Sequence, residues 1–192
     1  TAAHKAVEAL FESNLHGEVI TADEMIEIYK KMLERSFLTG AKFSDALERG
    51  KIFLPKYYEY RANNLPKKVK IETDFSYHNI LLDDIRLTGK IDMIEFTDDI
   101  SRRCVVYDFK TGDSTKGSKR VAFDEDIWRQ VVFYKLLTKL SRRFGFTMER
   151  GIVEFVEPDK EGNFTTVEVN VTDSELDIVK GQIKEMWTEL QS

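Results

Sequence analysis

Cysteine is almost absent from this chain, which removes several classes of site. Cys104 is the one cysteine in 192 residues, so the chain can form neither an internal disulfide nor a cysteine-rich zinc or iron–sulfur site of its own. Cys104 begins an apolar, strand-like run, and we expect it to be a small buried residue. So few cysteines are typical of proteins in the reducing cytoplasm, which is the location that we predict.

Long apolar runs are also missing. No stretch approaches the ~20 apolar residues that span a bilayer, and no signal peptide is visible, so no membrane partner is expected. The chain lacks the phosphate-binding pattern G-x-x-x-x-G-K-[ST], which argues against an ATPase and weakens the alternative of a nucleotide transferase or hydrolase. Because a helical pattern begins at once and without an initiator methionine, we expect the chain to be part of a longer protein.

The charge is unevenly distributed. The net charge is −5 and 42% of the residues are hydrophobic, which suits one globular domain over residues 1–192. Between Arg129 and Arg150 six basic residues face a single glutamate, whereas ten acids face three lysines from Glu154 onward. The basic region is compatible with a DNA-binding track and equally with a solvated helix face.

The hydrophobic period changes from 3.6 to 2 near Lys67, which divides the chain into a helical part (residues 1–65) and an α/β core (66–192). Thr21 with Glu24, and Thr172 with Glu175, form capping boxes that predict helix starts. Pro55 should kink or break the helix that contains it. The expected elements are helices over 1–14, 21–37, 43–61, 123–144 and 172–190, strands over 67–77, 85–96, 103–110, 151–156 and 164–171, and a polar loop over 114–120. This order predicts an α/β fold with a mixed central sheet flanked by helices.

Two apolar strands each carry one aspartate, Asp92 and Asp108, and Lys110 follows the second. Side chains alternate along a strand, so Asp108 and Lys110 must share a face. Two carboxylates can hold a hard divalent cation, and an ammonium can stabilise negative charge that develops on a phosphate. The alternative is an ordinary surface ion pair, but the apolar run before Asp108 predicts a buried strand, where charges need partners or a metal.

Four segments in this order resemble the PD-(D/E)xK phosphodiesterase superfamily, and most closely the RecB/AddB-type nuclease domains at the C-terminus of UvrD/Rep-type helicases. They are TAAHKAVEAL with His4, LTGKIDMIE with Gly89 and Asp92, VVYDFKTG with Asp108 and Lys110, and WRQVVFYKLL with Gln130 and Tyr134. AddB-type domains hold an iron–sulfur cluster on four cysteines, and this chain cannot.

The resemblance implies a restriction-endonuclease-like core and a site for Mg²⁺ or Mn²⁺. The implied metal ligands are His4, Asp92, Asp108 and the carbonyl of Phe109, and the implied catalytic residues are Asp92, Asp108, Lys110, Gln130 and Tyr134. Glu72 is a possible extra carboxylate. Glu95 lies three residues beyond Asp92 and should face the other way.

The resemblance also implies an activity and partners. The expected activity is metal-dependent hydrolysis of DNA, as an exonuclease acting on single strands or duplex ends, in DNA repair or recombination. The expected partners are DNA and the helicase motor domains of a parent chain or complex. The alternative is a non-catalytic DNA-binding or docking module that serves a helicase and keeps the nuclease fold.

Overall fold

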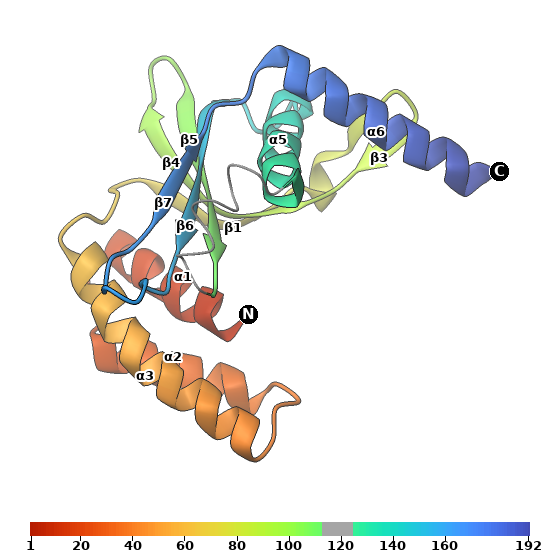
Figure 1. Ribbon diagram of the computed structural model, residues 1–192. Helices are drawn as coiled ribbons and strands as arrows, with labels where there is room; N and C mark the ends of the chain where they lie inside the picture. The colour runs from red at the N-terminus through yellow and green to blue at the C-terminus, as the bar shows by residue number, and fades with distance from the viewer. Residues whose placement is uncertain (113–124) are drawn as a thin grey trace.

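A computed structural model of the chain describes residues 1–112 and 125–192, which form a five-stranded sheet with helices on both faces (Figure 1). The predicted loop over 114–120 and the predicted helix start at Phe123 lie outside the described residues. The strands, in spatial order, are β1 (Val69–Asp74), β4 (Lys90–Asp98), β5 (Arg103–Lys110), β6 (Thr147–Phe155) and β7 (Thr166–Val169). β5 and β6 are parallel and the other neighbours are antiparallel. This confirms the predicted α/β fold with a mixed sheet.

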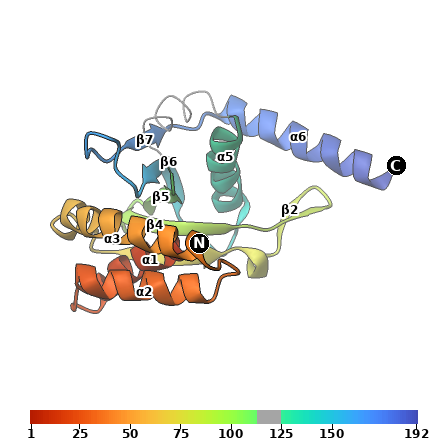
Figure 2. The same ribbon diagram turned by 60° about the horizontal axis from the view of Figure 1, so that its bottom comes forward.

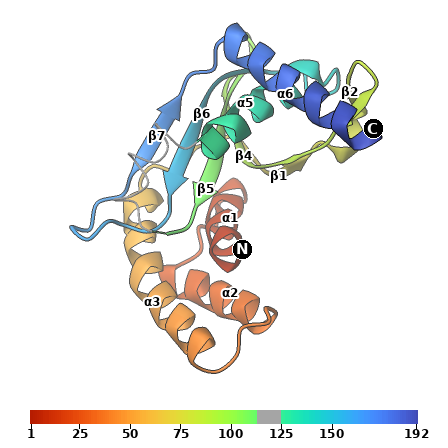
Figure 3. The ribbon, with the colours of Figure 1, turned by 45° about the vertical axis from the view of Figure 1, so that its right-hand side comes forward.

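The helices form two layers, one on each face of the sheet (Figures 2 and 3). One layer contains α1 (Ala2–Leu15), α2 (Ala22–Glu34) and α3 (Ala41–Ala62), and the other contains α5 (Glu125–Leu140) and α6 (Asp173–Gln191). β5 serves both cores by alternation: Tyr107 and Phe109 pack with α1–α3, whereas Cys104 and Val106 pack with α5. Among the described residues, no helix is long and apolar enough to cross a membrane.

Local hydrogen bonds explain most of the helix ends. Both predicted capping boxes are present, at the starts of α2 and α6. α3 runs without interruption through Pro55, so of the two expected outcomes, a kink or a break, the break does not occur. Phe53 and Leu54 are buried on this helix, and their packing offsets the hydrogen bond that Pro55 cannot donate. α5 ends at Leu140, earlier than predicted, where the Ser141 hydroxyl accepts the Phe144 amide at 3.2 Å and closes a turn.

The predicted strand over 85–96 is wrong in one respect, because it is two strands. β2 (Ile80–Leu82) and β3 (Ile85–Leu87) form a separate hairpin, and β4 begins only at Lys90. β1 ends at Asp74, whose carboxylate accepts the Ser76 amide at 2.8 Å and starts the 3₁₀ turn η1 (Ser76–His78). Gly89 lies between β3 and β4, where an added Cβ would stand 2.7 Å from Leu137. The chain therefore passes so close to α5 at Gly89 that there is no room for a side chain there.

The last two strands also differ from their predicted limits. β6 begins at Thr147 rather than Gly151, because residues from Thr147 onward already pair with β5. β7 covers Thr166–Val169 and is shorter than predicted. These differences extend the sheet but leave its order unchanged.

The contact of α5 with β6 depends on a glycine. A Cβ on Gly151 would lie 2.4 Å from Cγ1 of Val131, and a β-branched side chain has little freedom to move aside. We expect Gly151→Ala to lower the free energy of unfolding by about 1–3 kcal/mol, as overpacking does in other cores. Urea denaturation would measure it, with Gly181→Ala on α6, where an added Cβ meets nothing within 4 Å, as the control. Equal stability of the Gly151 variant and the wild type would contradict this reading of the packing.

Candidate active site

A polar site lies where β4 and β5 stop pairing. Their cross-strand register ends at Met93 and Tyr107. Beyond that point the Asp92 carboxylate accepts the Phe109 amide at 2.9 Å, in place of a backbone carbonyl. This hydrogen bond fixes Asp92 beside the segment that carries Asp108 and Lys110.

Asp108 is buried, with 3% of its surface exposed, and it projects from β5 toward α5. The Tyr134 hydroxyl donates to its Oδ1 at 3.0 Å, and the Lys110 ammonium lies 2.6 Å from its Oδ2. Oδ2 itself has no hydrogen bond of good geometry among the described residues. Burial raises the pKa of Asp108, and the nearby Asp92 adds to this, although Lys110 opposes it. The carboxylate is thus held in an environment that disfavours its charge.

Four side chains form a closed ring of polar contacts. Lys110 donates to Oε1 of Gln130 at 2.8 Å, and Nε2 of Gln130 donates to the Tyr134 hydroxyl at 2.6 Å. Tyr134 in turn donates to Asp108, so the donor and the acceptor of each of these three hydrogen bonds are determined. Burial, and then the charge of Asp108, raise the pKa of Tyr134, so the phenol remains a donor at neutral pH. Gln130 and Tyr134 are one helical turn apart, as predicted, and they fix Lys110 against Asp108.

His4 reaches the site from the opposite layer. It lies near the start of α1, and its Nε2 is 3.5 Å from Oδ2 of Asp92. Its Nδ1 contacts the Thr1 hydroxyl, which also caps the helix by accepting the His4 amide. The site therefore brings together all the predicted positions: His4 from α1, Asp92 from β4, Asp108, Phe109 and Lys110 from β5, and Gln130 and Tyr134 from α5.

The donor atoms suit a small hard cation. Carboxylate and carbonyl oxygens match the preferences of Mg²⁺ and Mn²⁺, and an imidazole nitrogen suits Mn²⁺ better than Mg²⁺. The buried Oδ2 of Asp108 is an acceptor that still lacks a hydrogen bond. In the part of the chain that the structure describes, however, no three His, Cys, Asp or Glu side chains converge as a metal-binding group. In this structure the positive charge beside the Asp108 carboxylate is the ammonium of Lys110.

A comparison with protein-family models decides the affiliation of the chain. The model described as the PD-(D/E)XK nuclease superfamily matches residues 1–192. The chain belongs to this superfamily. Membership implies a nuclease, that is, a hydrolase, and members of this superfamily generally use divalent metals. No curated protein matched the chain.

Beside the candidate site lies a cluster of charges that sequence reasoning missed in part. Glu72 has a left-handed backbone, with φ of 46°, and its carboxylate pairs with Lys5 at 2.5 Å and Lys90 at 2.7 Å. Burial acts to raise the pKa of Glu72, but the two lysines outweigh it and lower the pKa to about 2. Glu8 is buried and pairs with Lys5 at 2.8 Å. Glu8 lies one helical turn after His4, and this spacing was the signal that could have placed it near the site.

A second missed feature lies behind the candidate site, in the core of the α1–α3 layer. Glu154 on β6 is fully buried. It accepts hydrogen bonds from Tyr57 at 2.6 Å and from Arg61, both on α3. The Arg61 guanidinium also lies within 5.8 Å of the ring centroids of Phe11 and Tyr107. These contacts tie α3 to α1 and to β5, which carries Asp108.

Glu95 lies on this same side of the sheet. Its carboxylate accepts a hydrogen bond from the Tyr107 hydroxyl at 2.7 Å. The side chain therefore points away from Gln130 and Tyr134, in agreement with the alternation of β4.

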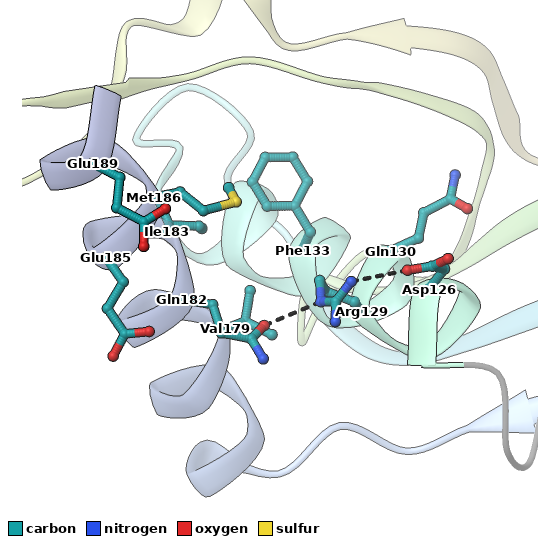
Figure 4. A pocket seen from close by; sticks show the side chains of 10 residues that line it. All are labelled: Asp126, Arg129, Gln130, Phe133, Val179, Gln182, Ile183, Glu185, Met186 and Glu189. Carbon is teal, nitrogen blue, oxygen red and sulfur yellow. Dashed lines mark hydrogen bonds and ion pairs between the residues drawn. The ribbon is translucent and has the colours of Figure 1, made fainter. Parts of the chain in front are cut away.

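A groove of about 610 Å³ between α5 and α6 adjoins the candidate site (Figure 4). Phe133 and Met186 project into it from the two helices, and Arg129 bridges Asp126 and Gln182 along one wall. Gln130 lines the groove while its amide contacts Lys110 and Tyr134. Gln130, one member of the ring of polar contacts, is therefore accessible from this groove.

Proposed function

We propose that this chain is a Mg²⁺- or Mn²⁺-dependent deoxyribonuclease. Its site for the hydrolysis of phosphodiester bonds lies at the start of β4 and the end of β5. The observation that carries the proposal is the ring of Asp108, Lys110, Gln130 and Tyr134, with Asp92 beside it. A structural ion pair would need neither a second aspartate nor a buried tyrosine and amide to orient it. The match to a nuclease superfamily supports the same conclusion.

The proposed metal ligands are His4, Asp92, Asp108 and the Phe109 carbonyl. A divalent ion bound there would lower the pKa of a coordinated water and polarise the scissile phosphate. Asp92 is held for this role by the Phe109 amide, and Asp108 by the Tyr134 hydroxyl.

Lys110 is the proposed catalytic cation. Its side chain is 26% exposed, so the ammonium can meet a substrate phosphate while Gln130 holds it. In this position it orients the attacking water or stabilises the negative charge of the transition state. Gln130 and Tyr134 act through Lys110 and Asp108, and they also help to place the DNA strand.

A finer assignment rests on the motifs alone. Their likeness to RecB/AddB-type domains supports an exonuclease that works with UvrD/Rep-type helicase motors in DNA repair or recombination. The product expected for this class carries a 5′-phosphate and a 3′-hydroxyl.

One observation favours a second candidate, a non-catalytic DNA-binding module of a helicase. Lys110 lies against the Asp108 oxygen that a metal would need, and no three acidic or imidazole side chains of the described residues converge as a metal site. Against this candidate, every chemically active position of the four motifs is retained. Metal binding and cleavage separate the two.

The proposal is tested by Lys110→Met, which removes the ammonium and keeps an apolar stem. We expect cleavage of labelled single- and double-stranded DNA in Mg²⁺ or Mn²⁺ to fall by about 10²–10³-fold, the usual cost of losing one charge-stabilising donor. Calorimetric titration should show that the variant still binds Mn²⁺, since its proposed ligands remain. Lys68→Met, at an exposed ion pair with Asp99, is the control and should cleave like the wild type. A wild-type domain that binds DNA but cuts none with either metal would favour the non-catalytic module.

A further inference from the structure

A second groove, separate from the nuclease site, lies at the C-terminal end of α5. Its volume is about 620 Å³, and it separates this helix end from the turn between η1 and β2. The lining residues are His78, Asn79, Leu81, Lys139, Leu140, Arg142 and Arg143.

The lining is cationic. Lys139, Arg142 and Arg143 contribute the charge, and none of the described residues that line it is acidic. Arg142 and Arg143 are both exposed. These positive charges gather in one groove although the net charge of the chain is −5.

Hydrogen bonds hold the cationic lining in place. Arg143 donates to the Tyr77 carbonyl at 2.9 Å, and His78 Nδ1 lies 2.6 Å from the Ser141 hydroxyl. Lys139 pairs at 2.8 Å with Asp173, which lies outside the lining. These contacts leave the remaining donors of Arg143 available to a ligand.

The local field in the groove is positive. Burial lowers the pKa of His78, and the charges of Lys70 and Arg143 lower it further, whereas Asp74 opposes them. Tyr77 and Leu81 stand exposed beside these cations, with 76% and 56% of their surfaces accessible. Cations flanked by exposed aromatic and apolar side chains are the usual surface for the backbone and bases of a nucleic-acid strand.

We propose that this groove, which we call the α5 basic groove, binds the phosphodiester backbone of the nucleic-acid substrate at a distance from the bond that is cut. The inference rests on the proposed nuclease function for the identity of the ligand. Charge complementarity with phosphate decides the occupant, because the lining offers several donors and, among its described residues, no carboxylate.

The length of α5 sets the distance between the two sites. Gln130 and Lys139 are on the same helix, nine positions apart. At ~1.5 Å per residue this separation is about 14 Å along the axis. Successive phosphates advance by about 3.4 Å along the axis of a duplex, so about four nucleotides of a duplex strand bridge the sites, and fewer nucleotides of an extended single strand do so. A substrate as short as a trinucleotide therefore cannot use the α5 basic groove while it is being cut.

The test is the double variant Arg142→Gln with Arg143→Gln, made in the full chain of 192 residues. Binding of a fluorescent 20-nucleotide single strand is measured by anisotropy in EDTA, so that no cleavage intervenes, between 50 and 200 mM salt. We expect about tenfold weaker binding at low salt and a salt slope that is smaller by about 1.4, since each single-strand phosphate contact contributes about 0.7. The double variant Lys42→Gln with Lys56→Gln on α3 removes the same charge and should bind like the wild type.

Two further readouts separate phosphate binding from a general loss of charge. Cleavage of a trinucleotide by the arginine variant should equal that of the wild type, whereas cleavage of the 20-mer should show a higher KM with kcat unchanged. The chain has three histidines, and in NMR titrations of the wild type the His78 pKa should rise when the 20-mer binds, because the bound phosphate offsets the field of Arg143 and Lys70.

The possible outcomes separate the α5 basic groove from its alternatives. Unchanged affinity and salt slope in the arginine variant, with cleavage intact, overturn the α5 basic groove and leave the nuclease proposal standing. DNA binding through the groove by a chain that cuts nothing supports the groove and rejects the nuclease proposal. Binding of vesicles that contain phosphatidylserine, lost in the variant while DNA binding is not, overturns the inference in favour of a membrane surface.

Discussion

Replacing Asp108 with asparagine is expected to lower the rate of DNA cleavage by about a thousandfold or more while raising the thermal midpoint of the domain. Asparagine keeps the shape of the side chain and can still accept the Tyr134 hydroxyl. It loses the charge that would bind a divalent ion and complete the electrostatic stabilisation of the transition state. Calorimetry should show that Mn²⁺ binding is lost with the activity.

The gain in stability follows from the direction of the pKa shift. Burial raises the folded-state pKa of Asp108 above its unfolded value, so the folded state favours the neutral carboxyl group. The stability that this provides is complete below the unfolded pKa and is lost as the pH rises through the folded pKa. At pH 7–8 the wild type therefore bears the cost of a buried charge that asparagine avoids.

Thermal unfolding of both proteins between pH 4 and 8 measures this effect. The difference in midpoint should shrink as the pH falls through the folded pKa of Asp108. Asp99→Asn, at an exposed carboxylate, should change neither midpoint nor cleavage rate. A lower midpoint for Asp108→Asn at pH 7–8 would instead show that the ion pair with Lys110 dominates.

Glu154→Ala is expected to cost about 3–5 kcal/mol of unfolding free energy, as does the removal of one partner from other buried ion pairs. The substitution leaves the guanidinium of Arg61, whose side chain is 13% exposed, and the buried Tyr57 hydroxyl without their acceptor. Urea denaturation measures the loss.

Two comparisons isolate its cause. Glu168→Ala removes an exposed carboxylate that pairs with Arg150 and should cost no more than about 1 kcal/mol. The double variant Arg61→Met with Glu154→Leu should recover most of the loss, because an apolar pair of similar volume replaces both charges. A Glu154→Ala domain as stable as Glu168→Ala would show that water reaches Arg61 and satisfies it.

Short-range patterns predicted much of this fold. The alternation around Asp108 gave the limits of β5 as the structure has them, and the two capping boxes gave the starts of α2 and α6. These signals depend on neighbours within four residues, which is why they can be read from one sequence. The helical spacing of Gln130 and Tyr134 likewise placed both side chains together, and the structure adds the direction of each hydrogen bond.

Features that depend on distant parts of the chain could not be predicted in this way. The bend at Gly89 exists because Leu137 on α5 occupies the space above it. The hydrogen bonds between Arg61 and Glu154 join residues 93 positions apart, and no local pattern marks either residue as buried. The pairing of Glu72 with Lys5 depends on how α1 rests against β1.

The location of the candidate site between two layers has a consequence for synthesis. His4 belongs to α1 on one face of the sheet, whereas Gln130 and Tyr134 belong to α5 on the other. The ring of polar contacts around Lys110 needs α5 as well as β5, so a chain that ends before residue 125 cannot form it. During synthesis the ring can therefore close only after α5 has been made and has packed on the sheet.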